Sequence, residues 1–134
     1  MAHSFDTVAR EVVELHEDLA AWLGSEAEKE ILDRFLDAQD SGFEMVSADG
    51  ALVARADLAS GLEGASNAQP GLEIGIDDVA IVADSDRSVV VRFRETHTTS
   101  AGSSTRVVTA VLVDSAGARN GLKWTYVHET AIPG

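Results

Sequence analysis

The stretch LEIGIDDVAIVADSDRSVVVRFRETHTTSAGSSTRVVTAVLVDSAGARNGLKWTYVHET, residues 72–130, decides the fold of this chain. It is rich in β-branched residues and is interrupted by clusters of Gly, Ser, Asp and Asn, which are typical of turns. Because these interruptions are short, neighbouring strands are expected to run antiparallel. The predicted strands cover residues 72–83, 87–98, 105–114 and 121–130.

The residues before this stretch have a helical periodicity instead. Apolar side chains recur at steps of three and four over residues 5–23, which predicts one long amphipathic helix. Ser25 followed by Glu28 is a capping-box pattern and predicts the start of a second helix. A short hairpin is expected over residues 43–53 and a short third helix over residues 55–62. Helices first and strands last predict an α+β fold, with the N-terminal helices packed on a curved antiparallel sheet.

Length, charge and composition narrow the classes of function. The chain has 134 residues, which fits a single domain spanning residues 1–134. Its net charge of −13 disfavours binding to nucleic acids and to anionic membranes. It contains no cysteine, so neither disulfides nor thiolate chemistry are expected. The N-terminus has no secretory pattern and no apolar run is long enough to span a membrane, which favours a cytoplasmic location.

Counting residues across symmetric hairpins assigns the strand side chains to the two faces of the sheet. The more apolar face is assigned to the helices, and four ionisable groups lie at one end of it. The apolar members are Val79, Ile81, Val89, Val91, Phe93, Val108, Ala110, Leu112 and Val127. The ionisable members, on the rim of a largely apolar cavity, are Glu95, His97, Arg106 and Glu129.

The opposite face of the predicted sheet has a different composition. It carries Ile74, Ile76, Arg92, Arg94, Thr109, Val111, Trp124, Tyr126 and His128. Aromatic residues and arginines on an open sheet face are typical of interfaces. The sequence therefore predicts a homodimer formed through Arg92, Arg94, Trp124, Tyr126 and His128. A single β-bulge would exchange the two faces over part of a strand.

The ionisable groups on the cavity rim allow two interpretations. A carboxylate or an imidazole in an apolar pocket has a pKa shifted toward neutrality and can act as a general acid or base. Glu95 and His97 are therefore the candidate catalytic residues, with Arg106 positioned to stabilise an anionic intermediate. Alternatively, Glu95, Arg106 and Glu129 form a set of ion pairs that closes the rim.

The remaining polar residues carry weaker chemical signals. His16 lies on the apolar face of the first helix, and it either points into the cavity or is a core residue with one hydrogen bond. No two histidines have the spacing of metal ligands, so neither a metal nor a cofactor is expected. The predicted ligand pocket consists of Trp22, His16, Phe35, Phe43, Phe93, Glu95, His97, Arg106 and Glu129.

Three short motifs, together with the order of the elements, resemble a known superfamily. The motifs are WTYVHETAIP at 124–133, FEMV at 43–46 ahead of Asp49-Gly50, and VVRFRE at 90–95. They resemble the nuclear-transport-factor-two-like, SnoaL-like superfamily, and within it the domain-of-unknown-function 4440 group. The resemblance implies a cone-shaped, cystatin-like fold that encloses a pocket, and a homodimer through the open sheet face. It implies no single activity.

Three functions are compatible with these observations. The first is a homodimeric small-molecule-binding domain whose ligand is apolar, with one acidic or carbonyl group near Arg106. The second is an isomerase or dehydratase that acts near a carbonyl, with Glu95 or His97 as the base. The only tyrosine of the chain, Tyr126, lies outside the first helix, which argues against an oxyanion hole built from tyrosines. The third is a structural assembly module whose cone is filled by its own side chains.

Overall fold

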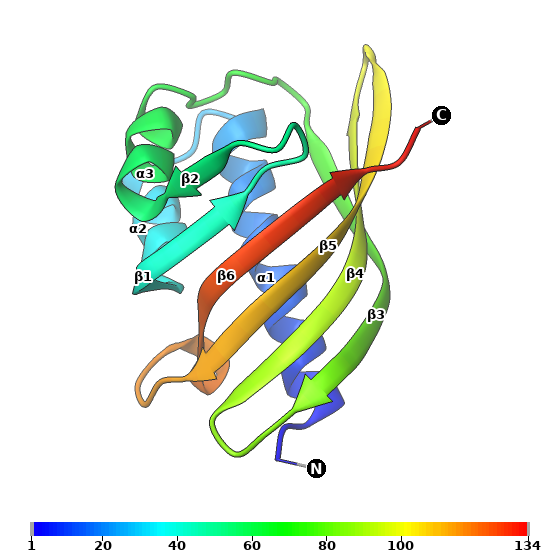
Figure 1. Ribbon diagram of the computed structural model, residues 1–134. Helices are drawn as coiled ribbons and strands as arrows, with labels where there is room; N and C mark the ends of the chain where they lie inside the picture. The colour runs from blue at the N-terminus through cyan, green and yellow to red at the C-terminus, as the bar shows by residue number, and fades with distance from the viewer. Residues whose placement is uncertain (1, 134) are drawn as a thin grey trace.

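The computed structural model describes residues 2–133 and arranges them as helices packed against one face of a curved sheet (Figure 1). The helices are α1 (Phe5–Gly24), α2 (Lys29–Asp37), α3 (Arg55–Glu63) and the short 3₁₀ helix η1 (Arg119–Gly121). The strands are β1 (Gln39–Val46), β2 (Leu52–Ala54), β3 (Glu73–Asp84), β4 (Ser88–Thr99), β5 (Gly102–Asp114) and β6 (Leu122–Ala131). The predicted α+β fold is confirmed.

The six strands form one sheet in the order β2-β1-β6-β5-β4-β3. The four C-terminal strands are antiparallel, as expected from their short connections. The prediction of a wholly antiparallel sheet was wrong, because β1 runs parallel to β6. These two strands are far apart in the sequence, so no tight turn joins them and no antiparallel pairing is imposed.

The long helix α1 crosses the inner face of the sheet (Figure 1). Ser4 caps its N-terminus by accepting a hydrogen bond from the backbone N–H of Thr7. The predicted apolar stripe is buried or half-buried from Val8 onward, and Val8 and Val12 have no exposed surface, whereas Phe5 at its start is 47% exposed. The stripe packs on the inward side chains of β4 and β5 in the hydrophobic core. No helix among residues 2–133 is both long and apolar enough to cross a membrane.

The second helix begins later than its sequence pattern predicted. Its N-cap is Glu28, and no side-chain cap is formed. The hydroxyl of Ser25 instead donates to the carbonyl of Ala21 in the last turn of α1. The capping-box prediction was wrong because Ser25 remains bonded to the end of the preceding helix.

Two β-bulges change the face assignments made by counting. Asp78 has a φ of 55° at a register shift in β3, so Ile74 and Ile76 pack against the core instead of lying on the outer face. A second shift, opposite the Val111/Leu112 step of β5, turns Trp124 inward, where it is 1% exposed. The prediction of Trp124 as a dimer-face residue was therefore wrong.

The segment between α3 and β3 runs along the end of α1. The backbone N–H groups of Asn67, Gln69 and Gly71 donate to the last carbonyls of α1, including the carbonyl of Gly24. This approach is close: a Cβ atom on Gly24 would lie 2.9 Å from the backbone nitrogen and oxygen of Leu72. Glycine at this position lets the connector pack directly on the helix end.

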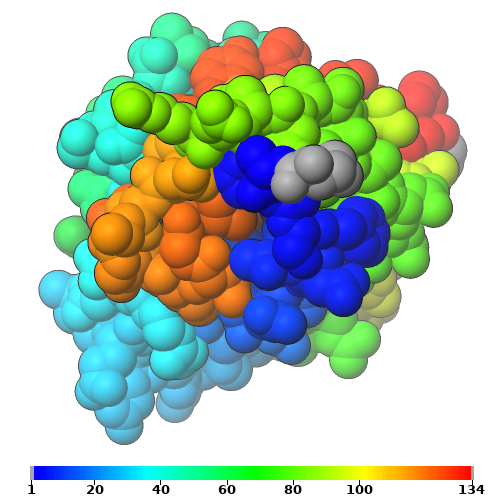
Figure 2. All heavy atoms as spheres, turned by 90° about the horizontal axis from the view of Figure 1, so that it is seen from below, coloured from blue at the N-terminus to red at the C-terminus, as the bar shows by residue number. Residues whose placement is uncertain are grey.

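The N-terminal residues, the loop before β6 and the β3–β4 turn meet at the end of the molecule shown in Figure 2. His3 joins two of the strands there. Its Nδ1 lies 2.6 Å from Oδ1 of Asp84, and its Nε2 lies 2.7 Å from Oδ1 of Asp114. The residues before α1 are thereby held against the ends of β3 and β5.

Candidate functional site

A cavity of about 200 Å³ lies between the helices and the inner face of the sheet. Its walls are apolar and come from all three α-helices and from four strands. The apolar lining consists of Leu15, Leu19, Leu23, Phe35, Phe43, Met45, Leu58, Leu62, Phe93, Val108, Trp124 and Val127. Six polar side chains also reach the cavity: His16, Gln39, Glu95, His97, Arg106 and Glu129.

Two histidines hold the carboxylate of Glu95 from opposite sides. Oε1 of Glu95 lies 3.0 Å from Nε2 of His16, and Oε2 lies 2.5 Å from Nε2 of His97. Glu95 is 2% exposed and His16 is 6% exposed, so this pair is shielded from water, whereas His97 is half-buried. Both oxygens of Glu95 are already engaged by histidines.

The hydrogen bonds of His16 determine its protonation. Nδ1 lies 2.7 Å from the backbone oxygen of Val12, one turn earlier in α1, while Nε2 faces Glu95. Both partners are acceptors, so both ring nitrogens must carry hydrogen, which makes His16 an imidazolium cation. The ring also packs edge-on against Phe93 and Trp124, with centroid separations of 5.4 and 6.0 Å.

The pKa values of this pair follow from two opposing effects. Burial alone would lower the pKa of His16, but the hydrogen bond to Glu95 and the charge of Glu95 outweigh it, and the pKa is raised. Burial alone would raise the pKa of Glu95, but hydrogen bonds from His16 and His97 and their charges hold it well below its usual range. Both shifts favour the charged forms, an imidazolium at His16 beside a carboxylate at Glu95.

A second pair lies beside the first. Nη1 of Arg106 lies 3.4 Å from Oε1 of Glu129, and neither side chain is fully buried. Burial raises the pKa of Glu129, and the negative charge of Glu95 raises it further, while Arg106 opposes both. Of the alternative ion-pair set, the pair Arg106–Glu129 is formed, whereas Glu95 is bound by the two histidines instead of by Arg106.

Eight of the nine predicted pocket residues line the cavity, and Trp22 does not. The indole of Trp22 is buried between α1 and α3, and its Nε1 donates to the carbonyl of Leu62 at 2.7 Å. Of the predicted dimer-face residues, Arg92, Arg94 and His128 are exposed and Tyr126 is half-buried on the outer face.

No pattern in the sequence pointed to Gln39 as a cavity residue. It lies at the start of β1, opposite Trp124, at a position that was expected to lie at the end of a helix. It is 3% exposed, and its Oε1 has no hydrogen-bond partner within residues 2–133. An unpaired buried amide oxygen on a cavity wall is unusual in folded proteins.

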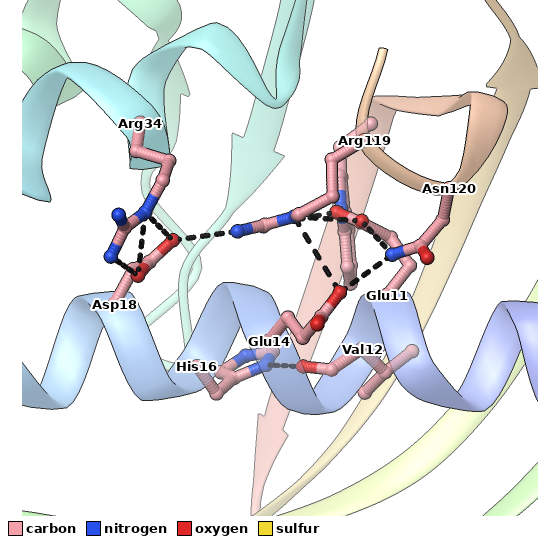
Figure 3. A network of polar contacts seen from close by, with 9 residues as sticks. Glu11, Val12, Glu14, His16, Asp18, Arg34, Arg119 and Asn120 are labelled. Carbon is pink, nitrogen blue, oxygen red and sulfur yellow. Dashed lines mark hydrogen bonds and ion pairs between the residues drawn. The ribbon is translucent and has the colours of Figure 1, made fainter.

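A separate polar network joins α1 to the loop before β6 (Figure 3). Glu11, which has no exposed surface, accepts hydrogen bonds from Arg119, Asn120 and Trp124. Arg119 also binds Asp18 at 2.8 Å. The sequence contains an indication of this network, because the acidic residues Glu11 and Asp18 lie at helical spacing within the apolar stripe of α1. The network closes one end of the core and positions Trp124 against His16.

No protein-family model matches the sequence, and neither does any curated protein. Solved structures do match the fold. An NTF-2-like protein of unknown function from Pseudomonas aeruginosa is 26% identical, with a TM-score of 0.88 over 95% of this chain and 99% of that one. ActVI-ORFA from Streptomyces coelicolor is 16% identical, with a TM-score of 0.69 over 95% and 96% of the two chains.

A third similar structure is the CaMKII hub of S. rosetta, at 14% identity and a TM-score of 0.65 over 92% of this chain and 95% of that one. These proteins share the order of the helices and the curved sheet while differing in sequence. The chain therefore has the NTF2-like, cystatin-like α+β fold.

Proposed function

We propose that this chain is a small-molecule-binding domain of the SnoaL-like, domain-of-unknown-function 4440 type, spanning residues 1–134, which holds its ligand in the cavity and acts as a cytoplasmic homodimer. The observation that carries the proposal is the chain His16–Glu95–His97 inside an otherwise apolar cavity. Charged groups in such surroundings cost free energy, and a ligand with a polar group offsets part of that cost.

The size of the cavity limits the ligand. An apolar cavity of about 150 Å³ accommodates benzene. The cavity here, at about 200 Å³, is suited to one ring or a short chain rather than to a fused polycyclic molecule. The ligand expected is a compact apolar molecule whose carbonyl or acidic group meets Arg106 and His97.

Acetophenone is a suitable first probe because it combines one ring with one carbonyl. Binding to the folded state is expected to raise the melting temperature as its concentration increases. The variant Val127→Phe fills part of the cavity and should abolish this shift, whereas Val82→Phe, at a site that is 54% exposed, should preserve it. A shift that survives in Val127→Phe would place binding elsewhere.

The geometry also supports a second candidate function, general acid–base catalysis near a carbonyl. Because both oxygens of Glu95 are engaged, we assign the role of base to Nδ1 of His97, with Glu95 stabilising the imidazolium that forms. His97 would remove a proton from the carbon next to the carbonyl, and the C–H electron pair would move to the oxygen as an enolate beside Arg106. Return of the proton to another carbon gives isomerisation, and protonation of a departing hydroxide gives dehydration.

His97 is also placed to exchange protons with solvent, because it lines a second, shallow depression with Gln69 and Ser104 at the surface. The test is exchange of the methyl protons of acetophenone in D2O, followed by NMR. We expect exchange above the buffer rate in the wild type and its loss in His97→Gln. Exchange at the buffer rate in the wild type would leave binding as the function.

The homodimer is proposed to form through the outer face of β4, β5 and β6. The net charge of the chain is −13. Within residues 2–133, however, the outward side chains at the centre of these strands include Arg92, Arg94 and His128 but no carboxylate. Repulsion between two acidic copies is therefore weakest at this face. Valines and Tyr126 supply its apolar surface, as is usual in interfaces.

Sedimentation equilibrium tests the dimer. The wild type is expected to sediment as a dimer at micromolar concentration and Val111→Glu as a monomer, because the new charge would be buried against the partner. A monomeric wild type would contradict this part of the proposal. The third candidate, an assembly module, is supported by the similarity to the CaMKII hub. The open cavity argues against it, since a purely structural cone would be filled by its own side chains.

A further inference from the structure

We infer that Gln39 is a specificity-determining residue of the cavity, and that the ligand presents to it a hydroxyl or N–H group separate from the group that meets His97. This inference rests on the proposed function, because it identifies the chemical class of the ligand. The ligand is thus a small monocyclic or short-chain molecule with two polar ends: a hydrogen-bond donor for Gln39 and a carbonyl or acidic oxygen at the histidines.

Within the part of the chain that the structure describes, the side-chain oxygen of Gln39 lacks a hydrogen bond. Gln39 is 3% exposed and lines the cavity, yet its Oε1 has no partner within the described residues 2–133. An amide oxygen is an acceptor, so only a donor satisfies it. Leaving such a group unpaired in the core is costly, and most buried polar atoms are paired.

The other polar groups of the same cavity differ from Gln39 in having partners. Glu95 is bound by two histidines, and Arg106 is bound to Glu129. Trp124, which lies opposite Gln39 in the sheet, directs its N–H away to Glu11 at 2.8 Å. These polar groups of the cavity are therefore bound to other residues, and we expect the donor for Gln39 to come from the contents of the cavity.

Gln39 and Glu95 lie on strands that are not neighbours in the sheet. Gln39 enters from β1, whereas Glu95 enters from β4, and β6 and β5 lie between these strands. The surfaces between the two polar sites are apolar, including Phe43, Val108 and Val127. A molecule that contacts both sites needs an apolar body with a polar group at each end.

The experiment uses matched ketones. The three positional isomers of hydroxyacetophenone are each paired with the methylacetophenone of the same shape, so that only O–H and CH₃ differ. Dissociation constants are measured by NMR titration of the full chain, and the side-chain NH₂ signals of Gln39 are assigned by their loss in Gln39→Met. We expect at least one hydroxyl isomer to bind about tenfold more tightly than its methyl partner and to shift the Gln39 signals.

In Gln39→Met this preference should disappear or reverse, because the near-isosteric thioether offers no comparable acceptor. If, in every pair, the wild type bound the hydroxyl and the methyl ketone with equal affinity, the inference would be overturned. This result is expected if a water molecule already donates a hydrogen bond to Gln39. A hydroxyl preference that persists in Gln39→Met would also overturn the inference. In both cases, binding of the methyl ketones would leave the proposed function intact. Failure of all six ketones to bind would overturn the inference and the proposed ligand-binding function together.

Discussion

The indole Nε1 of Trp124 lies 2.8 Å from Oε2 of Glu11, so that the last strand is bonded to the first helix through a carboxylate with no exposed surface. Arg119 and Asn120 bind the same carboxylate (Figure 3). We expect Glu11→Ala to lower the free energy of unfolding by about 3–5 kcal/mol, because it leaves an arginine and two further donors without their buried partner. Urea denaturation measures this loss.

Glu17→Ala is the matched control, because Glu17 is an exposed residue of the same helix. Its effect should stay within about 0.5 kcal/mol. Equal effects of the two substitutions would show that the network contributes nothing specific.

The pair His16–Glu95 predicts a stability maximum in mildly acidic solution. The lowered pKa of Glu95 stabilises the fold above the ordinary glutamate value of about 4.3, and this contribution is lost as the pH falls through the folded-state pKa. The raised pKa of His16 stabilises the fold below about 6.5, and that contribution is lost as the pH rises through the raised value. The stability difference between the wild type and Glu95→Gln should therefore be greatest between about pH 4.3 and 6.5. A difference that does not vary from pH 3 to 9 would contradict the charged pair.

His3 predicts a local pH effect at the N-terminus. Hydrogen bonds that the ring of His3 donates to the carboxylates of Asp84 and Asp114 raise the pKa of His3. Its contribution is present below about pH 6.5 and is lost as the pH rises through the raised value. Hydrogen exchange at the start of α1, corrected for the intrinsic pH dependence, should accelerate between pH 5.5 and 8.5 in the wild type. The variant His3→Gln should show no such change, and a change of the same size in it would exclude His3 as the cause.

Two glycines should respond oppositely to alanine. Gly24→Ala places a Cβ 2.9 Å from the Leu72 backbone, so we expect a loss of about 1–3 kcal/mol in the free energy of unfolding. Gly61→Ala lies in α3, with no atom within 4 Å of the added Cβ, and should stabilise the fold by about 0.5–1 kcal/mol. Thermal denaturation compares the two. An unchanged melting temperature in Gly24→Ala would mean that the connector is free to move away.

The unpaired amide of Gln39 predicts a stabilising core substitution. In the ligand-free protein, Gln39→Met removes an unsatisfied acceptor and adds apolar surface, so the free energy of unfolding should rise by about 1 kcal/mol. Phe43→Ala, on the same strand and cavity, should instead cost about 3–5 kcal/mol. A destabilised Gln39→Met would indicate that the amide has a partner in solution.

Local sequence patterns were sufficient to predict the types of secondary-structure element and the buried faces of β4 and α1. The alternation of Val89, Val91 and Phe93 allows only one face of β4 to be buried, and the helical spacing of Val8, Val12 and Leu15 does the same for α1. For this reason Glu95 could be placed on the inner face from local pattern alone. For its partner His16, the sequence could not distinguish a side chain in the cavity from one in the core. A helical periodicity indicates the direction in which a side chain points but not the residues that it contacts.

The orientation of Trp124 and the position of Gln39 depend on the register between strands, and they became clear only from the tertiary structure. The bulge opposite Val111 and Leu112 turned Trp124 from the outer face to the core, since one extra residue reverses the alternation of a strand. The parallel pairing of β1 with β6 places Gln39 at the cavity, and no turn motif in the sequence predicts this pairing. Local patterns involve neighbouring residues, whereas these features depend on how separate strands pair, as Gln39 pairs with Trp124 across 85 positions, and only the packing of the whole chain selects them.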